Sequence, residues 1–209
     1  MQLTDILKRE KLVAIVRGIT KEQARTVGEG LTRGGVRLME VTMNTEGALD
    51  MISDWRSRYD GTAYVGAGTV LDVDMAKEAV SAGAQFLISP NTDLAVIEYA
   101  LERGIDIWPG AMTPTEIVAA YSSGAEIIKL FPMASLGLAY LKELQGPLSH
   151  IPLLATGGVT LDNLQDYFAA GAAAVGLGSA LIPKDALLTK DVETVAERAQ
   201  AFVDRLKRV

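Results

Sequence analysis

The sequence predicts an α/β fold, a single (β/α)8 barrel preceded by a short N-terminal helix. Short runs rich in aliphatic and β-branched residues recur about every 20–25 residues, each followed by a polar or glycine break and a stretch of helical periodicity. Eight such runs alternate with helices, which is the strand number of a closed parallel barrel. With 209 residues, the chain is long enough for one well-buried domain, so we expect residues 1–209 to form a single barrel domain. The eight runs are 12–17, 37–43, 64–70, 86–91, 105–112, 127–132, 152–157 and 173–181.

A doubly wound open sheet is the alternative architecture, because it has the same alternation of strands and helices. No predicted strand is followed by a compact Gly-x-Gly-x-x-Gly helix start, which many proteins of that class carry. The count of eight strands and the missing fingerprint both favour the barrel.

The helices between the strands have clear end signals. Thr20 can cap a helix that runs to about Arg33 and ends at Gly34-Gly35. In Thr113-Pro114-Thr115-Glu116, proline occupies a first helical position and glutamate follows the capping threonine by three residues. The last segment, 191–207, has its apolar residues on one helical face. Residues expected to open further helices are Asp72, Asp93 and Thr160, and the pairs expected to end helices are Gly83-Ala84, Gly124-Ala125 and Gly171-Ala172.

Composition excludes several classes of function. The formal net charge is −6 and no basic cluster occurs, so we expect no nucleic-acid partner. The chain has no cysteine, which excludes disulfides, thiolate nucleophiles and cysteine-ligated metal sites. No apolar run reaches membrane-spanning length, and the N-terminus lacks a signal-peptide pattern. We therefore expect no membrane association and a cytoplasmic location.

Lys129 is the most informative residue, because it lies within the apolar, strand-like run 127–132. Burying an unpaired ammonium is costly, so such a lysine either extends its head to water or serves chemistry. Burial would lower its pKa from about 10.4 and make the amine a nucleophile capable of forming a Schiff base.

Polar residues stand at the C-terminal ends of several predicted strands, where barrel enzymes place their active sites. They are Arg17, Glu40, Thr42, Thr69, Lys129 and Thr156. Strand alternation puts Glu40 and Thr42 on one face of their strand. Glu40 is a candidate general acid/base beside the amine of Lys129, and the alternative is a plain buried ion pair between the two.

Glycines follow the seventh and eighth strands, at Gly157-Gly158 and in the segment that ends Gly178-Ser179. Loops after these two strands commonly bind phosphate in barrel enzymes, and exposed backbone N–H groups attract anions. We therefore expect a phosphate site there. His150 is the only histidine and lies in a turn without partners at metal-ligand spacing, so we expect a surface residue. Composition leaves a carboxylate-only magnesium or manganese site open, but no motif supports one, and we expect no metal.

Eight segments, taken together and in order, resemble the 2-keto-3-deoxy-6-phosphogluconate (KDPG) aldolases and their bifunctional relatives that also cleave 4-hydroxy-2-oxoglutarate. The resemblance runs through nearly the whole chain. The segments are Val13-Ala14-Ile15-Val16-Arg17-Gly18, Glu40-Val41-Thr42, Gly66-Ala67-Gly68-Thr69-Val70, Ile88-Ser89-Pro90, Pro109-Gly110, Ile128-Lys129-Leu130-Phe131-Pro132, Thr156-Gly157-Gly158-Val159 and Gly178-Ser179.

The resemblance implies a metal-free and cofactor-free class I aldolase, usually a homotrimer, that acts on a 2-keto-3-deoxy acid phosphate and releases pyruvate. By position, Lys129 would form the Schiff base, Glu40 would transfer protons and Thr156 would sit near the hydroxyl-bearing carbon. Thr69 would hold the pyruvate carboxylate. The residues that would bind phosphate are Gly157, Gly158, Gly178 and Ser179.

One departure concerns the carboxylate site. Well-known members have arginine four residues after the catalytic glutamate, whereas this chain has Asn44, which cannot make a charged bidentate contact. We infer that Arg17, at the neighbouring strand end, supplies the positive charge beside Asn44 and Thr69. The galactonate-type relatives usually have an aliphatic residue at the position of Thr156, so threonine favours the gluconate configuration.

Three functions compete at this point. The first is the KDPG aldolase, with the corresponding 6-phosphogalactonate aldolase as a close variant. The second is a phosphosugar epimerase or isomerase that uses Glu40 as a base while Lys129 only balances charge. The third is a sensor that binds a phosphometabolite without turnover. A Schiff base trapped on Lys129 would single out the first.

Overall fold

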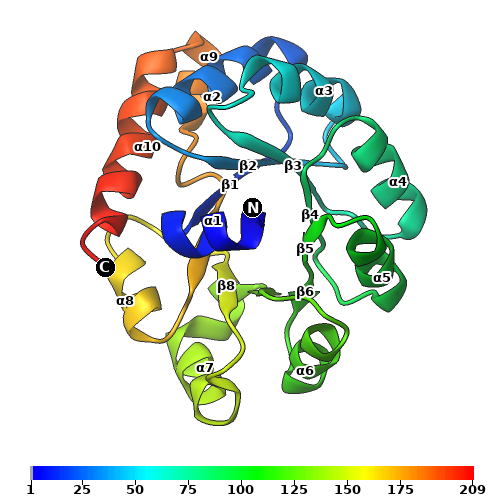
Figure 1. The fold of residues 1–209 in the computed structure, drawn as a ribbon. Helices are drawn as coiled ribbons and strands as arrows, with labels where there is room; N and C mark the ends of the chain where they lie inside the picture. Colours follow the sequence, from blue (N-terminus) through cyan, green and yellow to red (C-terminus); the bar gives the residue numbers. More distant parts are fainter. Residues whose placement is uncertain (1) are drawn as a thin grey trace.

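A ring of parallel strands forms the centre of the computed structural model, which describes residues 2–209 (Figure 1). Neighbouring strands follow the order β5-β4-β3-β2-β1-β9-β8-β7-β6, and every pairing is parallel. The strands are β1 (Leu12–Val16), β2 (Leu38–Thr42), β3 (Tyr64–Gly68), β4 (Phe86–Ile88), β5 (Asp106–Trp108), β6 (Gly110–Ala111), β7 (Ile128–Leu130), β8 (Leu153–Thr156) and β9 (Ala174–Leu177). Each predicted run contains a strand.

The fifth predicted run contains two strands, because Pro109 separates β5 from β6. β5 pairs with β4 and β6 pairs with β7, so the ring closes through this broken strand. The Lys129 N–H donates to the Pro109 carbonyl at 2.9 Å and bridges the break. Counted this way the ring has the eight strands of the predicted (β/α)8 barrel, which is confirmed.

Helices surround the ring and follow the strands in alternation (Figure 1). Thr20 and Thr113 form the capping boxes expected from the sequence. Thr160 does not open a helix: its hydroxyl accepts from the Asn163 N–H at 3.4 Å, and the helix begins only after Asn163. The helices are α1 (Leu3–Glu10), α2 (Lys21–Arg33), α3 (Ala48–Arg58), α4 (Val73–Ser81), α5 (Leu94–Glu102), α6 (Pro114–Ser122), α7 (Met133–Leu148), α8 (Leu164–Ala169), α9 (Lys184–Thr189) and α10 (Val192–Leu206).

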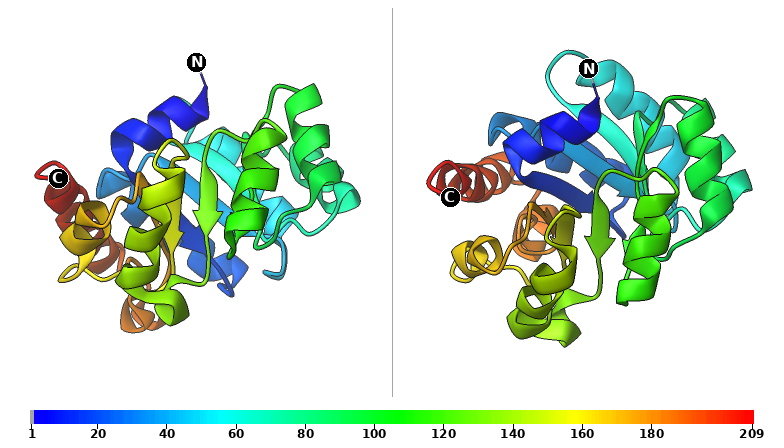
Figure 2. Two further views of the ribbon diagram at one scale, coloured as in Figure 1. Left: turned by 90° about the horizontal axis from the view of Figure 1, so that it is seen from below. Right: turned by 60° about the horizontal axis from the view of Figure 1, so that its bottom comes forward.

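Apolar side chains form two separate cores. The larger core lies between the strands and the surrounding helices. The smaller core fills the barrel and combines inward strand residues, among them Leu38, Phe86, Trp108 and Ile127, with Leu3, Ile6 and Leu7 of α1. The predicted N-terminal helix is therefore present, and it covers one end of the barrel (Figures 1 and 2). At the opposite end of the barrel, inward positions are occupied by polar residues, among them Glu40 and Lys129.

An aspartate on β5 fixes α1 in this place. Asp106 accepts from the Leu3 N–H at 2.9 Å and from the Thr4 N–H and hydroxyl at 3.2 and 2.6 Å. α1 has no capping side chain of its own at Gln2, so Asp106 satisfies the free N–H groups of its first turn. Among the helices of residues 2–209, none has the length and apolar character needed to span a membrane.

Candidate active site

Glu40 and Lys129 both point into the barrel. Leu38 and Ile127 belong to the core inside the barrel, and strand alternation turns the residues two positions further along to the same side. Glu40 on β2 is 1% exposed and Lys129 on β7 is 4% exposed. The structure therefore brings together the carboxylate and the amine that the sequence only placed on separate strands.

Burial favours the neutral form of both Glu40 and Lys129, because it removes their charged forms from water. It raises the pKa of Glu40, an effect opposed by the positive charges of Lys129 and Arg17. It also lowers the pKa of Lys129; Glu40 opposes this change and Arg17 adds to it. The neutral amine, the form that attacks a carbonyl, is thus favoured relative to an ordinary lysine.

The two groups do not form a close ion pair. Within residues 2–209, the side-chain pairs with N and O atoms within 4.0 Å include neither Glu40 nor Lys129. The Glu40 Oε2 atom is buried and has no hydrogen-bond partner in the described part of the chain. A buried carboxylate oxygen without a hydrogen bond lowers the stability of the fold. This arrangement argues against the alternative that Glu40 and Lys129 form only a structural ion pair.

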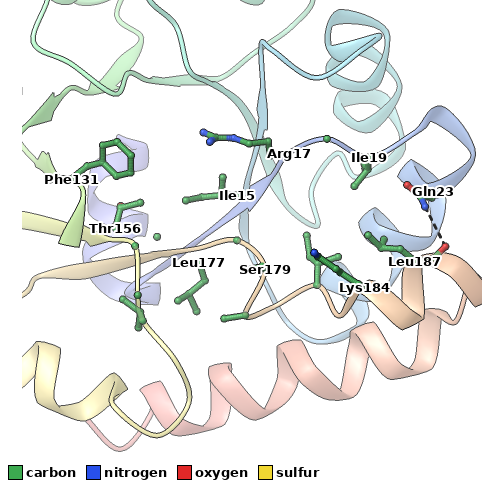
Figure 3. Close-up of a pocket in the computed structure, with 18 of the residues that line it drawn as sticks. Ile15, Arg17, Ile19, Gln23, Phe131, Thr156, Leu177, Ser179, Lys184 and Leu187 are labelled. Carbon is green, nitrogen blue, oxygen red and sulfur yellow. Dashed lines mark hydrogen bonds between the residues drawn. The ribbon is translucent and has the colours of Figure 1, made fainter. Parts of the chain in front are cut away.

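A cavity of about 650 Å³ lies at the C-terminal end of the barrel, and Lys129 is one of its lining residues. Figure 3 shows other residues of its wall. Thr156 contributes a hydroxyl that is buried and unpaired. Ile15 and Phe131 form an apolar part of the cavity wall, and the Nζ atom of Lys129 lies 5.2 Å from the ring centre of Phe131. The predicted site residues that line this cavity are Arg17, Lys129, Thr156, Gly157, Gly158, Gly178 and Ser179.

Three predicted residues lie outside the cavity wall. Glu40 is buried beside it, within the electrostatic influence of Lys129. Thr69 accepts a hydrogen bond from Nη2 of Arg17 at 3.2 Å, and its φ of +58° is the left-handed conformation, which is uncommon for threonine. Asn44 is exposed in the turn after β2 and does not reach the cavity. Arg17, at the end of β1, lines the cavity and brings a positive charge to its wall.

Glycines allow the side chains of the site to approach the backbone closely. A Cβ atom at Gly68 would lie 2.6 Å from the carboxyl carbon of Glu40, and one at Gly176 would lie 2.6 Å from the Thr156 hydroxyl. Gly157 and Gly158 have φ angles of +102° and +75°, which favour glycine. The predicted Gly157-Gly158 turn is therefore a backbone requirement as well as a candidate anion site.

Several residues in or beside the cavity could not be identified from the sequence alone. Thr45 is 4% exposed; its hydroxyl accepts from the Gly18 N–H at 3.0 Å and lies 3.0 Å from the hydroxyl of Thr42. This network ties the turn after β2 to the residue that follows Arg17. Lys184 and Gln23 line the cavity from elements that carried no site signal. A polar residue in a turn or at a helix start is too common to stand out by spacing.

His150 is exposed in the turn after α7, as expected, and its ring lies 5.8 Å from the Tyr121 ring, centre to centre. In the part of the chain that the structure describes, no group of three or more His, Cys, Asp or Glu side chains is placed to hold a metal ion.

Comparison with known proteins gives a consistent result. The family model described as KDPG and KHG aldolase matches residues 3–198. A 2-dehydro-3-deoxy-6-phosphogalactonate aldolase of Escherichia coli K12 is 35% identical over 193 residues, which is 92% of each chain. A KHG/KDPG aldolase of the same organism is 36% identical over 187 residues, 89% of this chain and 87% of the relative. A KDPG aldolase of Legionella pneumophila, solved with pyruvate as a covalent carbinolamine intermediate, superimposes with a TM-score of 0.88 at 26% identity and covers 96% of this chain and 98% of its own.

Proposed function

The chain belongs to the KDPG and KHG aldolase family, and from that premise we propose a class I aldolase that cleaves 2-keto-3-deoxy-6-phosphogluconate to pyruvate and glyceraldehyde 3-phosphate. Cleavage of 4-hydroxy-2-oxoglutarate to pyruvate and glyoxylate is a second activity of the same site. The observation that carries the proposal is the buried amine of Lys129, lowered in pKa and placed in a cavity wall beside a buried carboxylate.

Lys129 begins the reaction as the nucleophile. Its neutral amine attacks the C2 ketone of the substrate, and loss of water from the carbinolamine gives the imine. Glu40, whose pKa is raised, carries protons to and from this centre directly or through water. The protonated imine then accepts the electron pair of the breaking C3–C4 bond as Glu40 takes the proton of the C4 hydroxyl. Protonation of the enamine at C3 and hydrolysis of the imine release pyruvate and restore the amine.

The remaining site residues bind and orient the substrate. Arg17 and Thr69, which share a hydrogen bond, are placed to hold the carboxylate; Asn44, the third predicted carboxylate ligand, stays a prediction. The unpaired hydroxyl of Thr156 is placed to bind the hydroxyl group on C4 of the substrate. The phosphate ligands in this proposal are Gly157, Gly158, Gly178 and Ser179.

Borohydride reduction in the presence of pyruvate tests the proposal. We expect an adduct of pyruvate mass on Lys129, located by peptide mapping, and none in Lys129→Ala. Lys142→Ala removes an exposed amine from α7 and serves as the matched control, which should trap pyruvate like the unmodified protein. An adduct that persists in Lys129→Ala would refute the nucleophile, and an enzyme that turns over phosphosugars without any adduct would support an isomerase instead.

The gluconate and galactonate substrates differ only at C4, and relatives of both names match this chain about equally well. Thr156 favours the gluconate configuration, because its hydroxyl can pair with the C4 hydroxyl where an aliphatic residue cannot. Pyruvate release measured with both substrates separates them. A kcat/KM that is higher for the galactonate epimer would reverse the assignment.

We also place the enzyme in the cytoplasm as a homotrimer. The location follows from the substrate, since a phosphorylated sugar acid carries several charges and does not cross membranes unaided. The family resemblance supports the proposed trimer. Light scattering coupled to size exclusion should give a mass three times the chain mass of 22.3 kDa.

A further inference from the structure

The cavity wall has a charge pattern that the proposed chemistry does not account for in full. Three charged side chains line the cavity, Arg17, Lys129 and Lys184, and all three are positive. Among residues 2–209, no aspartate or glutamate lines it, although the chain as a whole has a formal net charge of −6. The cavity is therefore a local exception to an acidic protein, and this favours a ligand with more than one negative charge.

The three cations do not lie together. Arg17 and Lys129 belong to the strand-end part of the cavity, where the proposed keto acid binds. Lys184 is the first residue of α9 and, in Figure 3, lies on the side of Ser179 and Leu187, away from Phe131 and Thr156. Its side chain thus belongs to the end of the cavity where Ser179 lies, in the loop after β9.

The backbone that carries Lys184 is held on both sides. Ile182 and Ala186 flank it and are buried, at 6% and 2% exposure. Gln23 of α2 donates from Nε2 to the Leu187 carbonyl at 3.4 Å, and Arg198 of α10 donates from Nε to the Ala180 carbonyl at 2.9 Å. The lysine therefore extends from a fixed base rather than from a loose loop.

The ammonium of Lys184 has no ion-pair or hydrogen-bond partner among the residues that the structure describes. In residues 2–209, neither the ion pairs nor the side-chain hydrogen bonds include it. Its neighbour Asp185 does not compensate it, because successive residues of a helix point in different directions. An unpaired cation at the wall of a cavity that Gly178 and Ser179 also line is free to bind an anion.

We propose that Lys184 is a specificity-determining residue that contacts the phosphate at the far end of the substrate. The inference rests on the proposed aldolase function and deepens it. Glycine N–H groups can position a phosphate, but they carry no net charge. A lysine adds a positive point charge on a flexible side chain. The enzyme is thereby directed to a substrate with a carboxylate at one end and a phosphate at the other.

The test compares a phosphorylated with an unphosphorylated substrate. Lys184→Met keeps the apolar stem and removes the charge. We expect kcat/KM for 2-keto-3-deoxy-6-phosphogluconate to fall about 10-fold, mainly through KM, which is the size of one charged contact. We expect no change with 4-hydroxy-2-oxoglutarate, and Lys184→Arg should keep most of the preference. Lys190→Met, which removes an exposed lysine at the other end of α9, is the matched control.

Two outcomes overturn this role: an equal loss on both substrates, or an unchanged KM for the phosphorylated one. A readout without turnover guards against an inactive preparation. In the Lys129→Ala background, calorimetric titration with the phosphorylated keto acid should give a Kd about 10-fold weaker when Lys184→Met is added. If pyruvate still traps on Lys129 but Lys184→Met has no effect, only the Lys184 proposal fails. If no adduct forms, the aldolase itself fails.

Discussion

Lys129 lies in a balance of opposing electrostatic effects. Burial and the guanidinium of Arg17 lower its pKa, and the carboxylate of Glu40 raises it. The apolar run 127–132 left two interpretations open, an ammonium extended to water or a buried amine with a lowered pKa, and the 4% exposure of Lys129 shows that the amine is buried. The influence of Arg17 was not predictable, because it depends on the distance between two strands that the chain joins only by closing the barrel.

The balance predicts that two variants move the pH dependence in opposite directions. Imine formation needs the neutral amine, so its rate rises with pH through the lowered pKa of Lys129. Glu40→Gln removes the charge that raises this pKa and should shift the rise to lower pH. Arg17→Met removes a charge that lowers the pKa and should shift it to higher pH. Rates of borohydride trapping at saturating pyruvate, measured against pH, give both shifts. Parallel shifts would contradict the assigned charges.

Gly68 offers a second prediction, because its missing side chain leaves room for the Glu40 carboxyl. Gly68→Ala would place a Cβ atom 2.6 Å from the carboxyl carbon, so the carboxylate must move. We expect a fall in kcat of about 10²-fold, the usual size of one misplaced acid/base group, with the fold retained. Gly146→Ala is the control, since nothing lies within 4 Å of a Cβ atom there. Circular dichroism and kcat for both variants decide the matter, and equal kcat values would show that Glu40 does not depend on this space.

At the scale of elements, the two ends of the barrel have separate tasks. α1 and the inward apolar residues occupy one end, and the polar site occupies the other. Helix caps and strand runs followed the sequence closely, because they depend on neighbouring residues. The pairing of Asp106 with α1 joins residues 103 positions apart, and the strands on either side of Pro109 pair with different neighbours. Local patterns do not report such contacts.

This division predicts that Asp106→Ala lowers stability without changing the chemistry. The variant leaves the N–H groups of Leu3 and Thr4 without their acceptor, which costs about 1–3 kcal/mol. A domain of this size loses roughly 2–4 °C in melting temperature per kcal/mol. Asp5→Ala, which removes an exposed acid from the same helix, should have a smaller effect. Thermal melts and kcat of both variants test this; a drop in kcat for Asp106→Ala at a temperature well below its melt would mean that the two ends are coupled.

At the scale of the whole molecule, periodicity predicted the barrel and strand ends predicted most of the cavity. Seven of the predicted site residues line it: Arg17, Lys129, Thr156, Gly157, Gly158, Gly178 and Ser179. Thr45 and Lys184 were out of reach of the sequence, since a turn threonine and a helix-start lysine have the same local appearance in many surface positions. Asn44 shows the converse limit, because a family position does not fix where a shorter side chain lies.

The helix that covers one barrel end has a consequence for traffic through the enzyme. With α1 and its apolar neighbours filling that end, substrate and both products share the mouth at the glycine loops. In the proposed reaction, pyruvate stays bonded to Lys129 at the bottom while the aldehyde lies between it and the exit. The aldehyde must therefore depart first, and in the reverse reaction pyruvate must enter first. The shape of the barrel thus imposes an ordered release of products and an ordered binding of substrates.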